Sequence, residues 1–305
     1  MDSVLTLIAA PGKSLDSSTV DAARRALGNA GAADWLAPGT ACDIGFAGLD
    51  PVKAQDAVRA ALQDAPVDAV AQTAAGRRKR LLVADMDATA TEGETIDDLA
   101  ALAGIGPQIA AITASAMRGE LDFPTALRRR VALLEGMPES ALYRVRDAMK
   151  PMPGARALVA TMKKHGAYTV LVSGGFDVFT SHARALIGFH ESHGNRLEVA
   201  DGKLTGKVID PILGRDAKLA VLTSTAKSRG IAMAETMAVG DGANDLGMIQ
   251  AAGMGVAEDC GGVSTPNPSS TRAGVSVPSV PSADGPARSP PDTTDRRSIS
   301  TKAPV

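Results

Sequence analysis

The stretch RLLVADMDAT, residues 80–89, decides the fold of the larger part of this chain. Its apolar run, residues 81–84, is typical of a buried strand in a parallel sheet. Asp85 and Asp87 follow directly, so we expect both carboxyl groups at the carboxyl edge of the sheet, where open α/β sheets bind ligands. Acids this close do not both ionise freely without a neutralising cation, and with one they suit phosphoryl transfer. The alternative is a pair of acids that caps a strand-to-helix turn.

Composition sets limits on the class of protein. The 305 residues have room for two modest domains, and a net charge of −2 gives no reason to expect nucleic acid or an anionic membrane as a partner. Cys42 and Cys260 are too few and too far apart for a disulfide framework or a zinc site. The chain begins without the basic flank of a signal peptide and has no apolar run of about 20 residues. We therefore expect a cytoplasmic protein.

Residues 1–76 predict a small α+β domain. The pattern reads strand, helix, strand, strand, helix, strand, which is the order of a ferredoxin-like sandwich. The expected strands are residues 4–9, 33–36, 41–46 and 67–71, and the expected helices are residues 20–27, capped by the Ser-Ser-Thr at 17–19, and 51–62. The basic run at 77–80 is weak as a nucleic-acid patch, and we interpret it as a solvated linker.

Residues 77–257 alternate strands and helices, which predicts a parallel sheet with helices on both faces. The expected strands are residues 81–84, 168–172, 236–239 and 254–257. The helical stretch at about 95–150 is too long for a simple crossover, so we interpret it as a cap inserted over the carboxyl edge. Asp201-Gly202 within residues 197–208 predicts a hairpin.

Two further groups of polar residues follow predicted strands. Ser173, Gly174 and Gly175 offer a hydroxyl and close backbone amides to a phosphate, although a tight turn needs such glycines for geometry alone. Asp241 and Asp245 lie four apart at a helix start and can face one cation, although an N-capping cluster has the same composition. Lys218 alone reads as an exposed helix lysine, but a phosphate site with several carboxylates needs a fixed positive charge.

Along the chain the motifs come in the order Asp-x-Asp-x-Thr, Ser-Gly-Gly, Lys and Gly-Asp-Gly-x-Asn-Asp. This order resembles that of the haloacid dehalogenase superfamily, most closely its phosphoserine phosphatases, from about residue 80 to residue 257. The resemblance implies that Asp85 attacks phosphorus and that Asp87 protonates the leaving serine oxygen and then activates water. It implies that Ser173 and Lys218 stabilise the transferring group, with Asn244 nearby. The implied cofactor is Mg²⁺, held by Asp85, Asp241 and the backbone carbonyl of Asp87, with Asp245 binding the ion or orienting its water.

The resemblance also implies a small-molecule substrate, phosphoserine, and a role in serine biosynthesis. Glu94 matches the glutamate that binds the substrate amino group, and Arg130 matches the arginine that holds the carboxylate. Met117 and Phe123 match apolar residues on the cap side, and Gly174 and Gly175 join Ser173 at the phosphate. Two alternatives stay open: a phosphatase or phosphotransferase for another small phosphomonoester, and a non-catalytic amino-acid sensor with a disabled phosphatase domain.

The two ends of the chain carry further hypotheses. Residues 1–76 resemble the ACT-like regions of some bacterial members, which implies a candidate amino-acid regulator and a candidate homodimer. Residues 258–305 contain no Leu, Met, Phe, Tyr or Trp and many Pro, Ser and Thr, so we expect a disordered tail. Members of the family normally continue into further helix and strand, so we hypothesise that a frameshift replaced the native C-terminus. Ala88, Ala90 and Thr91 depart from the family pattern beside the catalytic set, and we expect modest effects there.

Overall fold

The computed structural model describes residues 1–10 and 12–257 and contains two separate sheets, one antiparallel with four strands and one with six. The predicted tail, residues 258–305, lies outside the described residues. None of the helices within the described ranges is long and apolar enough to cross a membrane. The two sheets have separate apolar cores, so they are described in turn.

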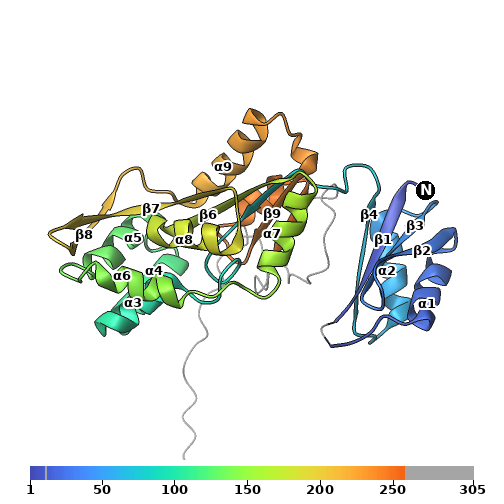
Figure 1. Cartoon of the computed structure of the whole chain (residues 1–305), viewed down its shortest axis with the longest axis horizontal. Helices are drawn as coiled ribbons and strands as arrows, with labels where there is room; N and C mark the ends of the chain where they lie inside the picture. The colour runs from blue at the N-terminus through green and yellow to red at the C-terminus, as the bar shows by residue number, and fades with distance from the viewer. Residues whose placement is uncertain (11, 258–305) are drawn as a thin grey trace, which may run out of the picture.

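The N-terminal sheet has the strand order β2-β3-β1-β4, and every neighbouring pair is antiparallel. Both helices cover the same face of this sheet (Figure 1). Leu5, Ile44 and Phe46 are fully buried beneath them. This arrangement confirms the predicted ferredoxin-like sandwich. In chain order its elements are β1 (Ser3–Ala9), α1 (Ser17–Leu27), β2 (Ala30–Ala37), β3 (Ala41–Phe46), α2 (Pro51–Leu62) and β4 (Val67–Thr73).

The start of α1 corrects one detail of the sequence prediction. The capping residue is Asp16, not one of the serines or the threonine that follow it, and its side chain accepts a hydrogen bond of 2.8 Å from the backbone N–H of Thr19. Ser18 donates its hydroxyl to the same carboxylate. Asp16 is favoured as the capping residue because its carboxylate also interacts favourably with the positive end of the helix dipole.

The larger sheet has the order β10-β9-β5-β6-β7-β8 and places β5 at its centre. All neighbouring pairs are parallel except the β7–β8 hairpin. Its strands are β5 (Leu81–Ala84), β6 (Tyr168–Phe176), β7 (Glu191–Ala200), β8 (Lys203–Ile209), β9 (Thr236–Gly240) and β10 (Met254–Ala257). The structure confirms the predicted parallel sheet, and β7 begins six residues earlier than the predicted hairpin.

Helices cover both faces of the larger sheet, as its apolar strands require. Leu82 and Ala84 pack into one core, while Leu81 and Val83 pack into another, because successive residues of a strand point to opposite faces. The helices that flank the sheet are α7 (Ala155–Lys164), α8 (Asp177–Ile187), α9 (Arg215–Ser228) and α10 (Leu246–Ala251), with a short 3₁₀ turn η1 (Met233–Glu235) before β9.

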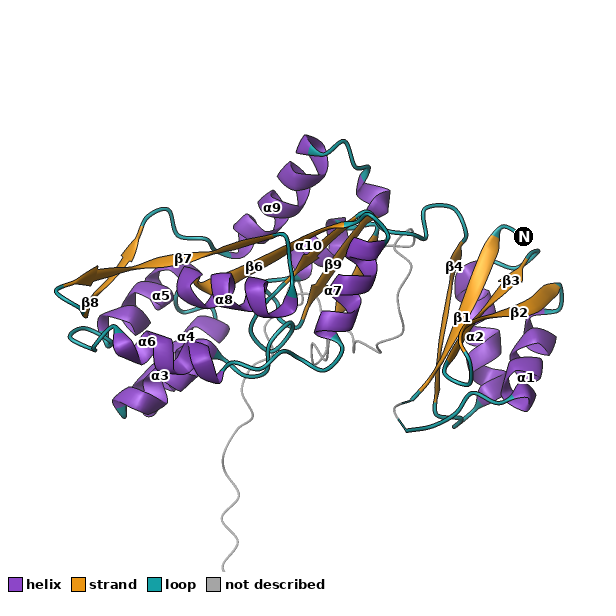
Figure 2. Ribbon diagram, viewed as in Figure 1, coloured by secondary structure: helices purple, strands orange, loops and turns teal. Residues whose placement is uncertain are grey.

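Four helices form the insertion between β5 and α7, beside the hairpin end of the sheet (Figure 2). Helix α5 packs against β8, and its Arg128 forms an ion pair of 2.7 Å with Asp210, just after that strand. The insertion therefore rests on the β7–β8 side of the sheet. Its helices are α3 (Thr95–Ala103), α4 (Gly106–Met117), α5 (Phe123–Ala132) and α6 (Ser140–Ala148).

The basic run at 77–80 joins the two sheets and is less solvated than the sequence suggests. Arg77 reaches back to the N-terminal sheet and forms a two-pronged ion pair with Asp43, with both nitrogen–oxygen distances at 2.6 Å. Lys79 and Arg80 bond the other way, to the backbone carbonyl of Ala234 and the carboxylate of Glu235 just before β9. The linker is therefore held on both sides.

Candidate active site

Three neighbouring strands deliver the predicted polar residues to one edge of the larger sheet. Asp85 follows β5, Ser173 lies in the last part of β6, and Asp241 follows β9. Because β9, β5 and β6 are adjacent and parallel, their carboxyl ends meet. A cavity of about 380 Å³ opens there, and the insertion helices supply its other wall. Of the thirteen predicted site residues, all except Lys218 and Asp245 line this cavity, which makes eleven. Besides Asp85, Ser173 and Asp241 they are Asp87, Glu94, Met117, Phe123, Arg130, Gly174, Gly175 and Asn244.

Lys218 lies beneath the cavity floor and bridges two acids. Its Nζ is 2.7 Å from Oδ1 of Asp85 and 2.6 Å from Oδ1 of Asp245, and all three side chains are buried. The other oxygen of Asp245 accepts a hydrogen bond from the backbone N–H of Gly242. Asp245 therefore fixes the ammonium group of Lys218 beside Asp85, and Lys218 is not the exposed lysine that its local sequence suggests.

Asp85, Asp245 and Lys218 combine two acidic groups with one basic group, and their pKa values reflect this imbalance. Burial raises the pKa of Asp85 to about 7, although the charge of Lys218 opposes the increase. Burial also raises the pKa of Asp245. Burial alone would lower the pKa of Lys218, but the two carboxylates outweigh it, so the net effect is an increase and the ammonium stays charged. The single positive charge of Lys218 therefore forms ion pairs with two acidic side chains.

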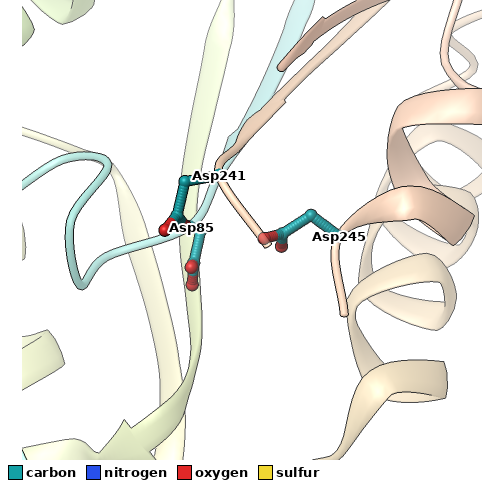
Figure 3. A group of neighbouring side chains, drawn as sticks. All are labelled: Asp85, Asp241 and Asp245. Carbon is teal, nitrogen blue, oxygen red and sulfur yellow. The ribbon is translucent and has the colours of Figure 1, made fainter. Parts of the chain in front are cut away.

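A third acid completes a candidate metal site. Carboxylate oxygens of Asp85, Asp241 and Asp245 lie within 4.8 Å of one another, and their side chains face a common space (Figure 3). The hydroxyl of Thr89 donates to Oδ1 of Asp241 at 3.1 Å and so orients that carboxylate. An all-oxygen donor set with excess negative charge fits a hard divalent cation. The carboxylate of Asp87 is not among these three.

Asp87 instead sits in a hydrogen-bond network of its own. Its Oδ1 accepts from the backbone N–H of Thr95 at 3.0 Å, and its Oδ2 accepts from the hydroxyl of Ser173 at 3.2 Å. Burial raises the pKa of Asp87 above its usual range, although these hydrogen bonds oppose the increase. A carboxyl group whose pKa is shifted towards neutrality can both give and take a proton.

Glu94 and Arg130 face the cavity from the insertion. Glu94 precedes α3, and burial, reinforced by Asp87 and Asp241, raises its pKa to about 7. Burial lowers the pKa of Arg130, which projects from α5, against the opposing charge of Glu94. Nε of Arg130 is a buried side-chain nitrogen that has no hydrogen-bond partner among the described residues. A buried guanidinium with an unused donor is suited to an anionic ligand group.

Glycines let the polar groups approach one another. A Cβ atom at Gly174 would lie 2.8 Å from the ring of Phe123, so this glycine admits the aromatic side chain from α5. A Cβ at Gly175 would lie 3.1 Å from Oδ2 of Asp87. At Gly240 and Gly242 it would collide with Asp245 and Asn244 respectively. By contrast, Met117 at the cavity rim is 84% exposed.

Sequence reasoning missed one polar residue that contacts the site loops. Asn195 of β7 is 1% exposed, and its side-chain amide bonds to the backbone of Gly174 and Leu213. These partners are 21 and 18 residues away along the chain, so no local pattern could have indicated them. The only local signal was a polar amide in a stretch that continues into a strand.

Known proteins resemble this chain in sequence and in fold. A family model described as haloacid dehalogenase-like hydrolase matches residues 82–250. The chain belongs to this family. A phosphoserine phosphatase of Streptomyces coelicolor is 40% identical over 222 residues, which cover 72% of this chain and 54% of that protein. The chain spans about half the length of the first curated relatives that it matches.

Two solved structures extend the comparison of this haloacid dehalogenase-like chain. A probable phosphoserine phosphatase from Vibrio cholerae, in unliganded form, has a TM-score of 0.69 and 29% identity, and covers 89% of this chain and 82% of its own. A phospho-aspartyl intermediate analogue of a phosphoserine phosphatase has a TM-score of 0.56 and 39% identity, and covers 59% and 87%. The first alignment includes much of the N-terminal sheet as well as the family domain.

Proposed function

We propose that the protein hydrolyses O-phospho-L-serine to L-serine and phosphate through an aspartyl phosphate on Asp85, as a step of serine biosynthesis. The observation that carries the substrate is the pair of opposite charges, Glu94 and Arg130, in the same cavity as the buried acids. A zwitterionic amino acid needs one acid for its ammonium group and one guanidinium for its carboxylate. The family and its phosphoserine phosphatase relatives support the reaction.

The phosphoryl group reacts at Asp85. A carboxylate oxygen of Asp85 forms a bond to phosphorus while the bond from phosphorus to the serine oxygen breaks. Lys218, 2.7 Å from Asp85 and held by Asp245, keeps this carboxylate in place and balances charge on the transferring group. The hydroxyl of Ser173 and the backbone amide of Gly174 bind the phosphoryl oxygens, with Gly175 and Asn244 in the same cavity lining.

Asp87 moves the protons. Its protonated carboxyl gives a proton to the serine oxygen as that oxygen leaves, and its carboxylate then takes a proton from the water that attacks phosphorus. This second attack breaks the bond between phosphorus and Asp85 and releases phosphate. Burial raises the pKa of Asp87, which favours the protonated form that the first step needs.

The implied cation is Mg²⁺, which Asp85 and Asp241 would hold together with the backbone carbonyl of Asp87, while Asp245 would be a further ligand or orient the ion's water. Asp85, Asp241 and Asp245 form the acidic group that supports this assignment. When bound, Mg²⁺ would screen the charge between Asp85 and the incoming phosphate. Five carboxyl groups (Asp85, Asp87, Glu94, Asp241, Asp245) face or underlie the cavity against the two cationic side chains of Lys218 and Arg130. A divalent cation offsets most of that excess.

Phosphate release from phosphoserine tests the proposal, with the full chain, Mg²⁺, and the Asp85→Asn variant as control. We expect release by the wild type and a loss of at least about 10³-fold in the variant, since an amide neither attacks phosphorus nor forms an aspartyl phosphate. Acid-stable incorporation of ³²P into the wild type but not the variant would add direct evidence. Equal activity in the two proteins would reject Asp85 as nucleophile. Preference for another phosphomonoester in a substrate panel would reject phosphoserine.

The N-terminal sheet supports a second, separate proposal about partners. Its βαββαβ order resembles ACT-like regions, so a free amino acid is the proposed regulator and a homodimer the proposed assembly, in a cytoplasmic setting. Activity measured across a panel of free amino acids, with light scattering on the same samples, tests both. No change in activity with any amino acid would reject the regulator, and a monomer at all concentrations would reject the dimer.

A further inference from the structure

The Ser173–Gly175 segment is an irregularity in the larger sheet. Val172 of β6 pairs with His193 of β7, and the next pair is Phe176 with Asn195. Three residues of β6 therefore lie opposite the single residue Gly194, and they bulge out of the ladder at the edge that carries the site. Such a bulge is not held by ladder hydrogen bonds, so something else must fix it.

The side chain of Asn195 supplies that support. Its Nδ2 donates to the carbonyl oxygen of Gly174 at 2.8 Å, and Asn195 does not line the cavity. A peptide unit is planar and trans, so fixing this carbonyl also fixes the direction of the N–H of Gly175 in the same unit. That N–H donates to Oγ of Ser173 at 2.8 Å. Ser173 then donates to Oδ2 of Asp87 at 3.2 Å.

The same amide also holds the segment that leads to Lys218. Nδ2 of Asn195 donates to the carbonyl oxygen of Leu213 at 3.1 Å, and its Oδ1 accepts from the N–H of Leu213 at 2.7 Å. Gly214 follows and caps α9, whose first turn carries Lys218. A Cβ at Gly214 would also lie 3.2 Å from Phe123, so this segment and the bulge both contact the same ring. Asn195 itself is buried, and its three hydrogen bonds are at least partly shielded from solvent.

We propose that Asn195 is a positioning residue for the reaction: it fixes the Gly174–Gly175 peptide and thereby orients the hydroxyl of Ser173 towards Asp87, while tying that bulge to the segment that begins α9. Asn195 touches neither the cavity nor the acidic cluster, so it acts through Ser173. This inference rests on the proposed function for the roles of Ser173 and Asp87. The hydrogen-bond chain itself is independent of the substrate.

A double-mutant cycle tests this role. We expect Asn195→Ala to lower kcat about tenfold, the effect of losing a buried hydrogen bond, with KM changed less than about threefold. In a Ser173→Ala background, Asn195→Ala should lower kcat less than about twofold, because the residue it orients is gone. Asn195→Asp, which keeps the volume and the acceptor for Leu213 but loses its donors when ionised, should match Asn195→Ala.

Thr169→Val is the matched control. Thr169 is fully buried at the other end of β6, and its hydroxyl bonds to His190, which is also 21 residues away. This variant should lower the melting temperature and leave kcat unchanged, in either background. Additive effects of Asn195→Ala and Ser173→Ala, or a kcat for Asn195→Ala equal to that of Thr169→Val, would overturn the proposal. Failure of both position-195 variants to fold would also overturn it, in favour of a purely structural role.

The cycle does not depend on phosphoserine. It is measured with whichever phosphomonoester the wild type hydrolyses, so rejection of phosphoserine leaves the cycle intact. If the wild type hydrolyses none, calorimetric binding of inorganic phosphate in the presence of Mg²⁺ replaces kcat, because Ser173 faces the same cavity. Coupling between Asn195 and Ser173 in phosphate affinity would then support the proposal, and independence would overturn it.

Discussion

The two sheets each hold an ionic cluster, partly buried in the N-terminal sheet and deeply buried in the larger sheet, and the clusters differ in the balance of their charges. In the N-terminal sheet, Arg77 forms a two-pronged ion pair with Asp43, and Thr6 donates to the same carboxylate at 2.7 Å. In the larger sheet, Lys218 serves both Asp85 and Asp245, and Asp241 lies within reach of both. The first cluster has one acid for one base, whereas the second has a surplus of acid.

The difference separates a structural ion pair from a reactive one. A buried pair with matched charges and satisfied hydrogen bonds has no further need of a ligand. A buried group of acids with too little positive charge either takes up protons or binds a cation, and perturbed groups of this kind gather at functional sites. The cluster of the larger sheet is also the more deeply buried of the two, which adds to the effect of its unbalanced charge.

Removing the base should have very different effects in the two clusters. Lys218→Met should lower kcat for phosphoserine about 10³-fold, because the fixed charge beside Asp85 is lost. Steady-state kinetics of the full chain with Mg²⁺ measures this effect. Arg77→Met is the control, because it removes a partly buried, ion-paired cation that does not line the cavity. A loss below about tenfold for Lys218→Met would show that the larger cluster, too, is only structural.

Glu94→Gln tests whether one of the acidic side chains in the larger sheet's cavity binds the ammonium group of the substrate. We expect KM for phosphoserine to rise about 10- to 100-fold, with little change for a phosphomonoester that lacks an amino group. Because burial raises the pKa of Glu94 to about 7, its charged form is lost as pH falls through about 7. The wild-type KM for phosphoserine should therefore rise below about pH 7, and the variant should lose this dependence. Equal effects on both substrates would remove Glu94 from ammonium binding.

The response of stability to Mg²⁺ sharpens the comparison further. Burial raises the pKa of Asp85 to about 7, so the folded state keeps a proton that the unfolded chain releases near its ordinary value of 3.8. Without a cation, stability should fall as pH rises from about 4 to 7. Mg²⁺ at about 100 times its Kd should raise the melting temperature by roughly 5–10 °C at about pH 8 and by less at about pH 5.

Melting curves with Mg²⁺ or with a chelator, at both pH values, measure this response. Asp241→Asn should abolish most of the Mg²⁺-induced shift, while Asp43→Asn should leave it intact. A shift that is the same at both pH values, or that survives Asp241→Asn, would place the cation elsewhere.

The smallest effect on activity is expected at the balanced cluster. Arg77→Met should reduce the free energy of unfolding by about 2 kcal/mol, since it leaves Asp43 mostly buried without its partner. The value of kcat should stay within about twofold of the wild type. Denaturant unfolding and steady-state kinetics on the same samples test both parts. A large loss of kcat would show that the linker couples the N-terminal sheet to the site.

The sequence was sufficient for the elements whose signal is local. The strand Leu81–Ala84 is an uninterrupted apolar run, and Asp50-Pro51 marks the start of α2, so both were predicted with correct bounds. The first half of β7, Glu191–Asn195, was missed because it is polar and reads as loop. Pairing with the buried strand β6 makes it a strand, and such pairing has no trace in a short window.

The candidate site divides in the same way. Asp85, Asp241 and Ser173 were placed by the rule that parallel strands end at one edge, which needs only the strands themselves. Lys218 looked like an exposed helix residue because its partner Asp245 is 27 residues away. Asn195 gave no signal at all, since its contacts depend on how the bulge of β6 and the start of α9 come together.

The close packing around the acids also has a consequence for how the gene can vary. Gly240 and Gly242 carry no reactive atom, yet a single added methyl group at either would collide with Asp245 or Asn244. In a survey of every single substitution, these silent positions should be as intolerant as the acids themselves. The positions at which selection acts would then include more than the reacting residues. They would include glycines, where the lack of a side chain is what the site requires.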